Sequence, residues 1–338
     1  MEKRIRAAER GNGMRTTKIG QTAATVTDIS FGCASIGNLY REIPDAVAQD
    51  VLQEAWDSGI RYFDTAPHYG RGLSEQRLGR FLKGRDGFTL STKVGRVLRP
   101  AAAPISEADS YVNPAQNDVH YDYSGDGIEE SLEQSLKRLG VGRINILYVH
   151  DLGTYTHGAA NPAHMEAFLG SGYERLVRLK EAGRIDAFGL GVNECDVCLQ
   201  VMDHGPVDVI LLAGRLTLLD RSAEVELVPR CRAAGTSLVL GGVFNSGILA
   251  TGPVEGATYD YGPAPQDVLN RVAELQYLAQ SAGVPLASLA LHFARQHPAA
   301  SSVLLGTAKP ATLRRNLQAL QQDLPPKAKD VLAKVMMA

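Results

Sequence analysis

The sequence lacks any apolar run long enough to cross a membrane. None of its segments approaches the roughly 18 consecutive apolar residues of a transmembrane helix. The first 13 residues carry charges and no apolar core, which is not the pattern of a secretory signal peptide. We therefore expect no membrane partner and a cytoplasmic location. We interpret residues 1–13 as a disordered extension and residues 14–338 as one domain, a length within the range of a single α/β barrel.

Cysteine is also scarce, with four in 338 residues, which excludes a disulfide framework. Cys195 and Cys198 form a C-x-x-C pair, which could be a redox pair or half of a zinc site. A zinc site would need a second close pair, and Cys33 and Cys231 lie far apart in the sequence. We interpret the pair as buried thiols on a helix and expect no metal site.

The chain has little excess charge of either sign. A net charge of −2 at pH 7 gives no reason to expect binding to nucleic acid or to an anionic membrane surface. Nor is there a basic stripe or a basic segment interleaved with aromatic residues. We expect a small-molecule substrate as the partner of a monomer or a small homo-oligomer.

What the chain does contain is a repeated pattern, in which eight short apolar runs alternate with amphipathic segments. This alternation is typical of β-α units around a parallel sheet buried on both faces, and eight units predict a closed TIM (β/α)8 barrel. An open doubly wound sheet would usually have fewer units and a G-x-G-x-x-G turn, which Gly32–Gly37 does not match. The predicted strands are Ile29–Ala34, Tyr62–Ala66, Phe88–Val94, Ile144–His150, Ala187–Val192, Val207–Ala213, Ser237–Val243 and Ser302–Gly306.

The amphipathic segments between these runs predict the outer helices. Ser74 followed by Glu75 indicates a capping residue and an acid in the first turn of one helix. Gly140 and Gly183 each end a helix. The predicted helices are Asp45–Ser58, Ser74–Leu82, Gly127–Leu139, Tyr173–Ala182, Glu194–Asp203, Ala223–Ala234 and Ala311–Leu320, with an extra helix, Val284–Gln296, before the last strand.

Three segments depart from the simple repeat. Met14–Asp28 alternates around Gly20 and predicts a hairpin that caps the N-terminal mouth of the barrel. Gly95–Gly125 and Val243–Asp267 are long connections that follow strands, so both should lie over the C-terminal mouth. Loops of this length within a compact domain are usually functional or disordered.

Ionisable side chains stand at the carboxyl ends of successive predicted strands. Asp64, Lys93 and His150 end the second, third and fourth strands. Asn193 follows the fifth strand, and Tyr69 lies in the loop after Asp64. Alone, each has an ordinary explanation, such as a helix cap, a solvated lysine or a core histidine. Together they predict one catalytic site, because TIM-barrel enzymes keep their active sites at this end of the barrel.

These residue types suit proton transfer to or from an oxygen atom. A free tyrosine has a pKa of about 10, too high for easy exchange at neutral pH. We expect the ammonium of Lys93 to lower the pKa of Tyr69, while Asp64 holds the lysine charged. His150 would hydrogen-bond the substrate oxygen and orient it. Tyr69 is then the general acid or base while hydride moves to or from the carbon.

Several motifs surround these residues in a fixed order. They are Phe63–Gly70, Ser74-Glu75, Leu78-Gly79, Ser91–Lys93, Leu147–Asp151, Gly189–Asn193 and Leu304–Asn316. Together they resemble the motifs of the aldo-keto reductases, from about Met14 to about Leu320. The resemblance implies a nicotinamide cofactor bound without a Rossmann fold. It also implies that Asp64, Tyr69, Lys93 and His150 form the catalytic tetrad, and that Asn193 binds the nicotinamide carboxamide.

The resemblance further implies where the cofactor lies. The pyrophosphate should meet the loop after the seventh strand, where backbone N–H groups and a hydroxyl suit phosphate oxygens, although Asn245–Gly247 could also be a plain turn. The adenosine end should meet the segment after the last strand. The implied contacts are Gly32, Asn193, Leu211, Phe244, Asn245, Ser246, Gly247, Leu249, Gly306, Thr307, Lys309, Thr312 and Asn316.

Departures from the family pattern bear on the choice of cofactor. NADP-specific relatives carry a lysine at the position of Gly306 and an arginine at that of Thr312, both used on the 2′-phosphate. Two missing cations remove charge-assisted bonds worth about 1.5–3 kcal/mol each. We therefore expect NAD rather than NADP, although Lys309 and Arg315 could restore phosphate affinity. Leu211 also stands where the family usually has a glutamine.

Asp151, the run Leu211–Leu219 and Phe244–Gly247 resemble one bacterial branch of the family. That branch contains aldose 1-dehydrogenases acting on L-fucose, L-galactose or D-arabinose, and pyridoxal 4-dehydrogenases. Both oxidise a cyclic hemiacetal to a lactone with NAD(P), and we expect the aldose reaction. A sugar needs polar partners, because buried hydroxyls left unpaired are costly. The candidates are His68, Tyr40, Asp151, Arg215 and the Gly95–Gly125 loop.

Three alternatives stay open. A pyridoxal 4-dehydrogenase would want aromatic contacts, for which Tyr111, Tyr121, Tyr123 and Trp56 are candidates by composition, although we expect Trp56 in the core. A second alternative is a broad aldehyde or ketone reductase that uses NADPH. The third is a non-catalytic, cofactor-sensing subunit, which should bind the cofactor but turn over poorly. The complete tetrad argues against the third.

Overall fold

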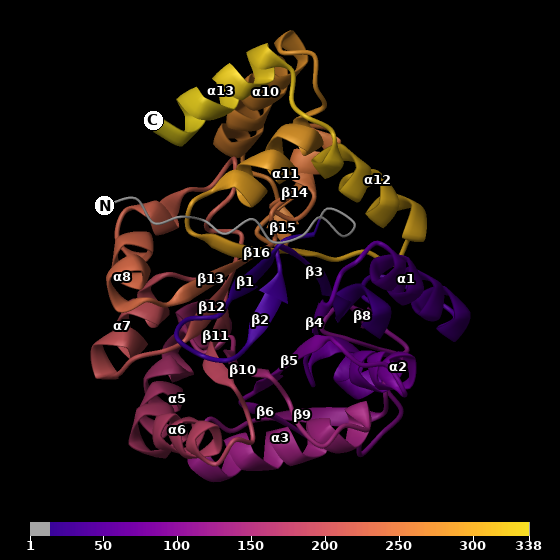
Figure 1. The fold of residues 1–338 in the computed structure, drawn as a ribbon. Helices are drawn as coiled ribbons and strands as arrows, with labels where there is room; N and C mark the ends of the chain where they lie inside the picture. The colour runs from indigo at the N-terminus through magenta and orange to yellow at the C-terminus, as the bar shows by residue number, and fades with distance from the viewer. Residues whose placement is uncertain (1–13, 338) are drawn as a thin grey trace.

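The computed structural model describes residues 14–337, so the predicted disordered extension, residues 1–13, lies outside the described residues. Parallel strands close into a barrel in the order β10-β11-β12-β13-β16-β3-β4-β5 (Figure 1). Each strand overlaps one predicted apolar run, and the predicted TIM barrel is confirmed. The barrel strands are β3 (Ile29–Gly32), β4 (Tyr62–Asp64), β5 (Thr89–Val94), β10 (Ile146–His150), β11 (Ala187–Val192), β12 (Val209–Ala213), β13 (Ser237–Gly241) and β16 (Ala300–Leu305).

The predicted helices form the outer layer of the barrel. In α3, the side chain of Ser124 accepts from the backbone N–H of Gly127 and caps the helix, and Gly140 ends it at a φ of 67°. The predicted Gly stop is therefore confirmed, while the start lies two residues earlier than predicted. The helices are α1 (Asp45–Asp57), α2 (Leu73–Leu82), α3 (Gly125–Leu139), α6 (Tyr173–Glu181), α7 (Asp196–His204), α8 (Leu227–Ala234), α11 (Leu286–Gln296) and α12 (Pro310–Gln321).

The predicted capping role of Ser74 is wrong. Gly72, at a φ of 103°, precedes α2, and no side chain caps the helix. The hydroxyl of Ser74 is instead buried and donates to the carbonyl of Cys33 at 2.8 Å. Glu75 is also buried, where it accepts from the hydroxyl of Thr92 at 2.6 Å and pairs with Arg138 at 2.5 Å. The predicted acid in the first turn is confirmed, since Glu75 lies there, and both residues fasten α2 to its neighbours.

Several elements were not predicted. The helices α10 and α13 pack with α11 into a separate apolar cluster, which includes Val268, Val272 and Leu332 (Figure 1). Their apolar residues meet one another outside the barrel, so the β-α repeat carries no signal for them. The unpredicted helices are α4 (Thr154–His157), α5 (Asn161–Ala167), α9 (Ile248–Thr251), α10 (Gln266–Ser281) and α13 (Pro326–Met337).

A hairpin closes the N-terminal mouth of the barrel, as predicted. Strand β1 (Thr16–Lys18) pairs antiparallel with β2 (Thr25–Thr27). Ile19, Ala24 and Val26 of the hairpin share a buried cluster with the barrel interior. Figure 1 shows the hairpin lying across the barrel centre. Among the described residues, this hairpin therefore covers the base of the barrel.

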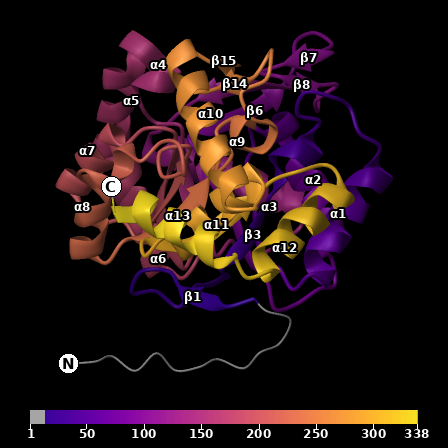
Figure 2. The same ribbon diagram turned by 90° about the horizontal axis from the view of Figure 1, so that it is seen from above.

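The two long connections fold into hairpins over the C-terminal mouth. In the first, β6 (Arg96–Pro100) pairs with β9 (Asn117–Tyr121), and β7 (Glu107–Ala108) pairs with β8 (Tyr111–Val112). In the second, β14 (Thr258–Tyr259) pairs with β15 (Gly262–Pro263). Figure 2 shows these hairpins on the side of the molecule opposite β1. The prediction that both connections cover this mouth is confirmed.

The four cysteines are free thiols, with Cys198 buried in α7 and Cys195 half-buried just before it. Within residues 14–337, no group of three or more His, Cys, Asp or Glu side chains is arranged to hold a metal ion. The same part of the chain has no helix that is long and apolar enough to span a bilayer.

Candidate active site

A buried ion pair lies at the C-terminal mouth. Lys93 on β5 and Asp64 at the end of β4 are 1% and 0% exposed. Lys93 Nζ donates to Asp64 Oδ2 at 2.6 Å and to the carbonyl of Thr65 at 2.9 Å. The other carboxylate oxygen accepts from the hydroxyl of Ser91 at 2.7 Å. These hydrogen bonds matter because taking two charges out of water is costly unless each is well paired.

A layer of hydroxyl groups supports this pair from inside the barrel. The hydroxyl of Tyr62 lies 3.0 Å from Ser91 Oγ and 2.9 Å from the hydroxyl of Tyr148. All three side chains are buried. Ser91 thus connects Asp64 to a closed polar layer, which fixes the orientation of the carboxylate.

Tyr69 lies beside the ion pair, in a short 3-10 helix over Tyr69–Gly72. Its ring centroid is 4.6 Å from Lys93 Nζ and 5.7 Å from the ring of His150, which is turned by 87°. Gly70 makes the turn possible, because its φ is 62° and a Cβ there would lie 2.3 Å from the carbonyl oxygen of Gly37. The structure therefore brings the four predicted tetrad residues together.

The predicted lowering of the Tyr69 pKa by Lys93 is not what the structure shows. Burial, followed by the negative charge of Asp64, raises the pKa of Tyr69 well above its usual value. The ammonium of Lys93 is neutralised by Asp64 at 2.6 Å, so it adds little net positive potential at the phenol. A further positive charge nearby is needed before Tyr69 ionises close to neutral pH.

His150 and His68 face Tyr69 as neutral imidazoles. Burial lowers the pKa of both well below the usual value, and the positive charge of Arg96 lowers both further. His150 Nε2 lies 3.4 Å from Asp151 Oδ2. The Nδ1 atoms of both rings are buried without a hydrogen-bond partner among residues 14–337. Neutral imidazoles can hydrogen-bond a substrate oxygen without adding charge to the site.

A cavity of about 390 Å³ opens beside Tyr69, Lys93 and His150. Three of the predicted substrate residues, Tyr40, His68 and Asp151, line it. Asp109 and Ser110, from the predicted Gly95–Gly125 loop, line it as well. The sequence reasoning missed the residues that reach the wall from other segments, namely Leu39, Tyr155, Thr156 and Tyr261.

The four aromatic candidates for substrate contacts lie in different places, and one of them lines the cavity. Tyr111 lines the cavity, and its ring lies 5.5 Å from that of His68. Tyr121 is exposed on β9 and lies outside the cavity wall. Tyr123 is buried and donates to the carbonyl of His150 at 2.7 Å. Trp56 stacks on Phe63 in the core, as expected.

A second cavity, of about 380 Å³, shares Tyr69, Asn193 and Leu211 with the first. Most of the predicted cofactor contacts line it, namely Gly32, Asn193, Leu211, Phe244, Asn245, Ser246, Gly247, Gly306, Thr307 and Asn316. Leu249 does not, because it is fully buried in the cluster around α11. Lys309 and Thr312 lie outside the lining as well.

The loop after β13 is a tight turn whose residues line this cavity. Asn245 and Ser246 have φ angles of 45° and 58°, and Gly247 has 99°. The side chain of Asn245 is occupied, since it accepts from Thr217 at 2.6 Å and donates to the carbonyl of Gly214 at 3.0 Å. Its amide therefore fixes the loop, and such strained backbone often marks a binding site.

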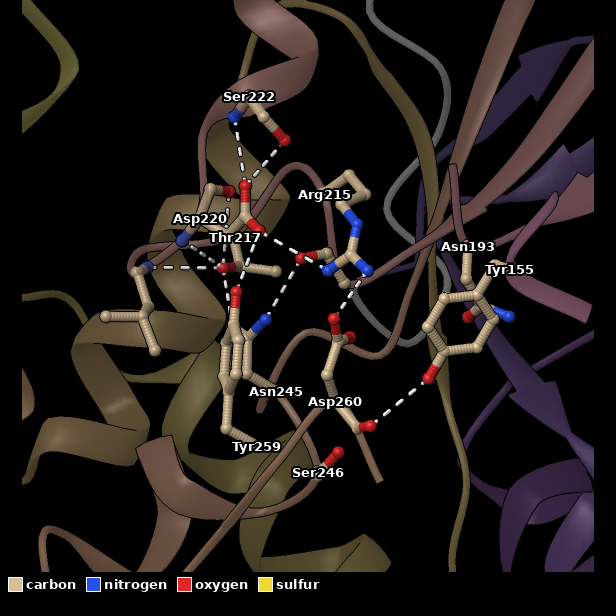
Figure 3. A network of polar contacts seen from close by, with 12 residues as sticks. Tyr155, Asn193, Arg215, Thr217, Asp220, Ser222, Asn245, Ser246, Tyr259 and Asp260 are labelled. Carbon is tan, nitrogen blue, oxygen red and sulfur yellow. Dashed lines mark hydrogen bonds and ion pairs between the residues drawn. The ribbon is translucent and has the colours of Figure 1, made fainter. Parts of the chain in front are cut away.

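The turn between β14 and β15 crosses between the two cavities, with Tyr261 lining both. An ionic network holds it there (Figure 3). Arg215, predicted as a substrate contact, lies outside both linings and pairs with Asp260 at 2.7 Å and Asp220 at 3.4 Å. Tyr155 donates to the carbonyl of Asp260 at 3.1 Å. Arg215 therefore acts on this turn instead of on the substrate cavity.

Comparison with known families matches residues 28–335 to the aldo/keto reductase family. The chain belongs to this family. It is 39% identical to a pyridoxal 4-dehydrogenase of Microbacterium luteolum, over 91% of this chain and 93% of that one. It is 35% identical to a D-threo-aldose 1-dehydrogenase of a Pseudomonas species, over 92% and 95%. The structure resembles a holo aldo-keto reductase of Bacillus halodurans with a TM-score of 0.74 at 25% identity, covering 95% and 96% of the two chains.

This aldo-keto reductase is thus an NAD(P)-dependent oxidoreductase. The second cavity fits a nicotinamide cofactor, because it runs from Tyr69 and Asn193 to Gly306 and Asn316. A Cβ at Gly306 would lie 3.2 Å from the carbonyl oxygen of Gly32. A side chain at Gly306 would therefore crowd the backbone of β3 at this edge of the cavity.

Proposed function

We propose that this aldo-keto reductase oxidises the C1 hydroxyl of a cyclic aldose, of the L-fucose, L-galactose or D-arabinose type, to the lactone. The observation that carries the proposal is the ring of polar groups around the first cavity, which includes Asp109, Ser110, Asp151 and Thr156 beside Tyr69. Several polar groups suit a substrate with several hydroxyls, since each needs a partner when buried. The aldose dehydrogenase relative supports the same chemistry.

In the proposed reaction, phenolate Tyr69 accepts the proton of the anomeric hydroxyl as the C1–H electron pair leaves as hydride and C1=O forms. The neutral imidazole of His150 hydrogen-bonds the same oxygen and orients it. Asp64 keeps Lys93 fixed against the face of the Tyr69 ring. When bound, the oxidised nicotinamide supplies the hydride acceptor and a positive charge. Asn193 is the proposed contact of its carboxamide, at the junction of the two cavities.

We propose NAD as the preferred cofactor. Supporting this, the cavity wall at Gly306, Thr307 and Asn316 offers no cationic side chain for a 2′-phosphate. Replacing Thr312, which is half-buried at the start of α12, by arginine should raise the ratio of kcat/KM for NADP over NAD by about 10- to 100-fold, the effect of one charge-assisted bond. Steady-state kinetics with both cofactors measure the ratio. A wild type that prefers NADP would contradict the proposal.

The network around Arg215 should control cofactor exchange. In Arg215→Met, Asp260 loses its 2.7 Å partner and the turn between β14 and β15 is held less firmly. We expect dissociation of NADH to become about tenfold faster, as for the loss of one contact of roughly 1.5 kcal/mol. Stopped-flow fluorescence measures the rate. Arg230→Met removes an ion pair between exposed side chains with Asp203 and is the matched control. Equal rates in the two variants would contradict this role.

A second candidate is oxidation of pyridoxal in its cyclic hemiacetal form. The observation that favours it is the aromatic wall formed by Tyr40, Tyr111, Tyr155 and Tyr261, which suits a flat ring. The pyridoxal 4-dehydrogenase relative supports this candidate. The bond changes at the reacting carbon are the same, so Tyr69 and His150 keep their proposed roles.

One screen separates the possibilities. NAD reduction is followed with L-fucose, L-galactose, D-arabinose and pyridoxal, and the lactone is identified by mass spectrometry. Oxidation of an aldose with the highest kcat/KM supports the first proposal, and a preference for pyridoxal replaces it with the second. Faster NADPH-dependent reduction of simple aldehydes would indicate a broad reductase. Cofactor binding without turnover of any substrate would indicate a cofactor-sensing subunit.

We further propose that residues 14–338 act as one catalytic domain in a monomer or a small homo-oligomer. A cytoplasmic location is also proposed. The four free thiols support it, because unpaired cysteines are usual in a reducing compartment.

A further inference from the structure

A buried guanidinium lies behind the proposed active site. Arg96 starts β6, and its side chain is 3% exposed. Its Nη2 pairs with Asp151 Oδ2 at 2.5 Å, while Nε and Nη1 are buried without a hydrogen-bond partner among residues 14–337. Burying a charge with so few partners is costly for stability. Such an arrangement is a candidate for a functional role.

Asp151 connects this guanidinium to two functional side chains. Its φ of 48° is in the left-handed region, and its backbone N–H donates to the carbonyl of Gly191 at 2.9 Å. Its Oδ2 lies 3.4 Å from His150 Nε2, and its Oδ1 accepts from Asn193 Nδ2 at 3.4 Å. One carboxylate therefore touches the imidazole beside Tyr69 and the amide at the junction of the cavities.

We propose that Arg96 is a positioning residue, which acts through Asp151 to fix the imidazole of His150 and the amide of Asn193 in one arrangement. The inference rests on the proposed function, because it gives these two groups their tasks. An arginine suits this place, since its planar fork holds a carboxylate in a defined orientation that a lysine does not reproduce. Asp151 is then mainly a link between residues and only secondarily a substrate contact.

Arg96 also keeps His150 neutral. Burial lowers the pKa of His150, and the charge of Arg96 lowers it further. Without Arg96, the positive charge that lowers the pKa of His150 is lost, so the pKa of His150 should rise. Burial raises the pKa of Asp151, which lies 3.4 Å from Nε2, and Arg96 lowers it, so Asp151 becomes a weaker acid in the same variant. The other titratable groups that face His150 stay in place, namely Lys93, His68 and Tyr69.

The test measures the pKa of His150 directly. Carbon-13-labelled histidine is titrated by NMR without substrate or cofactor, with the His150 signal assigned by its loss in His150→Gln. In Arg96→Met, we expect the pKa of His150 to rise by about one unit or more. Arg99→Met is the matched control: Arg99 is three residues along β6, exposed, and paired with Glu130. It should leave the pKa of His150 unchanged.

Asp151→Asn gives a second, opposite shift. It removes the negative charge and leaves Arg96, so the pKa of His150 should fall. General damage to the fold would not move the pKa in opposite directions in two variants. Arg96→Lys keeps the charge without the fork, so it should restore the His150 pKa but not the full kcat.

Activity adds a second readout. The acidic limb of the kcat–pH profile should shift to higher pH in Arg96→Met. It should not shift in Arg99→Met. Equal His150 titrations in Arg96→Met and Arg99→Met would overturn the positioning role, whatever the activity. Shifted titrations in a protein that oxidises no substrate in the screen would instead overturn the proposed function and leave the link from Arg96 to His150 standing.

Discussion

Tyr69→Phe is expected to lower kcat/KM for hemiacetal oxidation by about 10²- to 10⁴-fold, the usual contribution of a positioned general acid or base. The phenylalanine ring keeps the packing against Lys93 and His150, whose ring lies 5.7 Å away, and removes only the hydroxyl. Because burial raises the pKa of Tyr69, wild-type oxidation should speed up toward alkaline pH. Initial rates of NAD reduction between pH 6 and about pH 10 measure both effects.

The control for this prediction is Tyr277→Phe, the same chemical change on α10 at a side chain that is 71% exposed. It should retain wild-type kinetics, and both variants should bind NAD as the wild type does. A Tyr69→Phe enzyme with a wild-type rate and an unchanged alkaline rise would contradict the assignment of Tyr69 as the proton acceptor.

The second large effect is on stability. Asp64→Asn should lower the free energy of unfolding by about 3–5 kcal/mol, because it leaves the ammonium of Lys93 buried without its 2.6 Å partner. Burial outweighs the attraction of Lys93 and raises the pKa of Asp64, so the pair itself adds little net stability. The double variant Asp64→Asn, Lys93→Met should therefore recover much of the loss while remaining inactive. Urea unfolding followed by circular dichroism measures the free energies.

Glu174→Gln is the matched control for the stability measurement. It removes one carboxylate from the ion pair with Arg178, in which both side chains are about two-thirds exposed. A change below about 0.5 kcal/mol is expected there. If Asp64→Asn were no more destabilising than Glu174→Gln, the claim that an unpaired, buried Lys93 ammonium is costly would be wrong.

Some of the site could be predicted from the sequence because it depends on the order of residues along strands. Asp64, Lys93 and His150 each follow an apolar run, and parallel strands in a closed barrel bring their carboxyl ends to one mouth. The loop residues of the site were harder to predict from the sequence. Tyr111 was a candidate only by composition and Tyr261 was missed, because each reaches the cavity through a short hairpin whose direction depends on contacts far away in the sequence.

The partners of charged residues show most clearly what the sequence alone does not predict. Arg215 and Arg96 are both arginines near the mouth, yet Asp260 and Asp220 hold the first, while the second is buried against Asp151. Asp260 and Asp151 lie 45 and 55 residues from their arginines, so local spacing reveals neither pairing. The expected lowering of the Tyr69 pKa failed for the same reason, since it omitted the desolvation and the charge of Asp64 that the fold imposes.

By itself, the sequence determined that this protein is a (β/α)8 barrel and which polar residues end its strands, because buried strands require apolar runs whose spacing is visible in one dimension. The tertiary structure alone decided which of those polar groups are free, which are neutralised and what surrounds them. These properties depend on distances between remote segments and on the exclusion of water, and neither is encoded in local spacing.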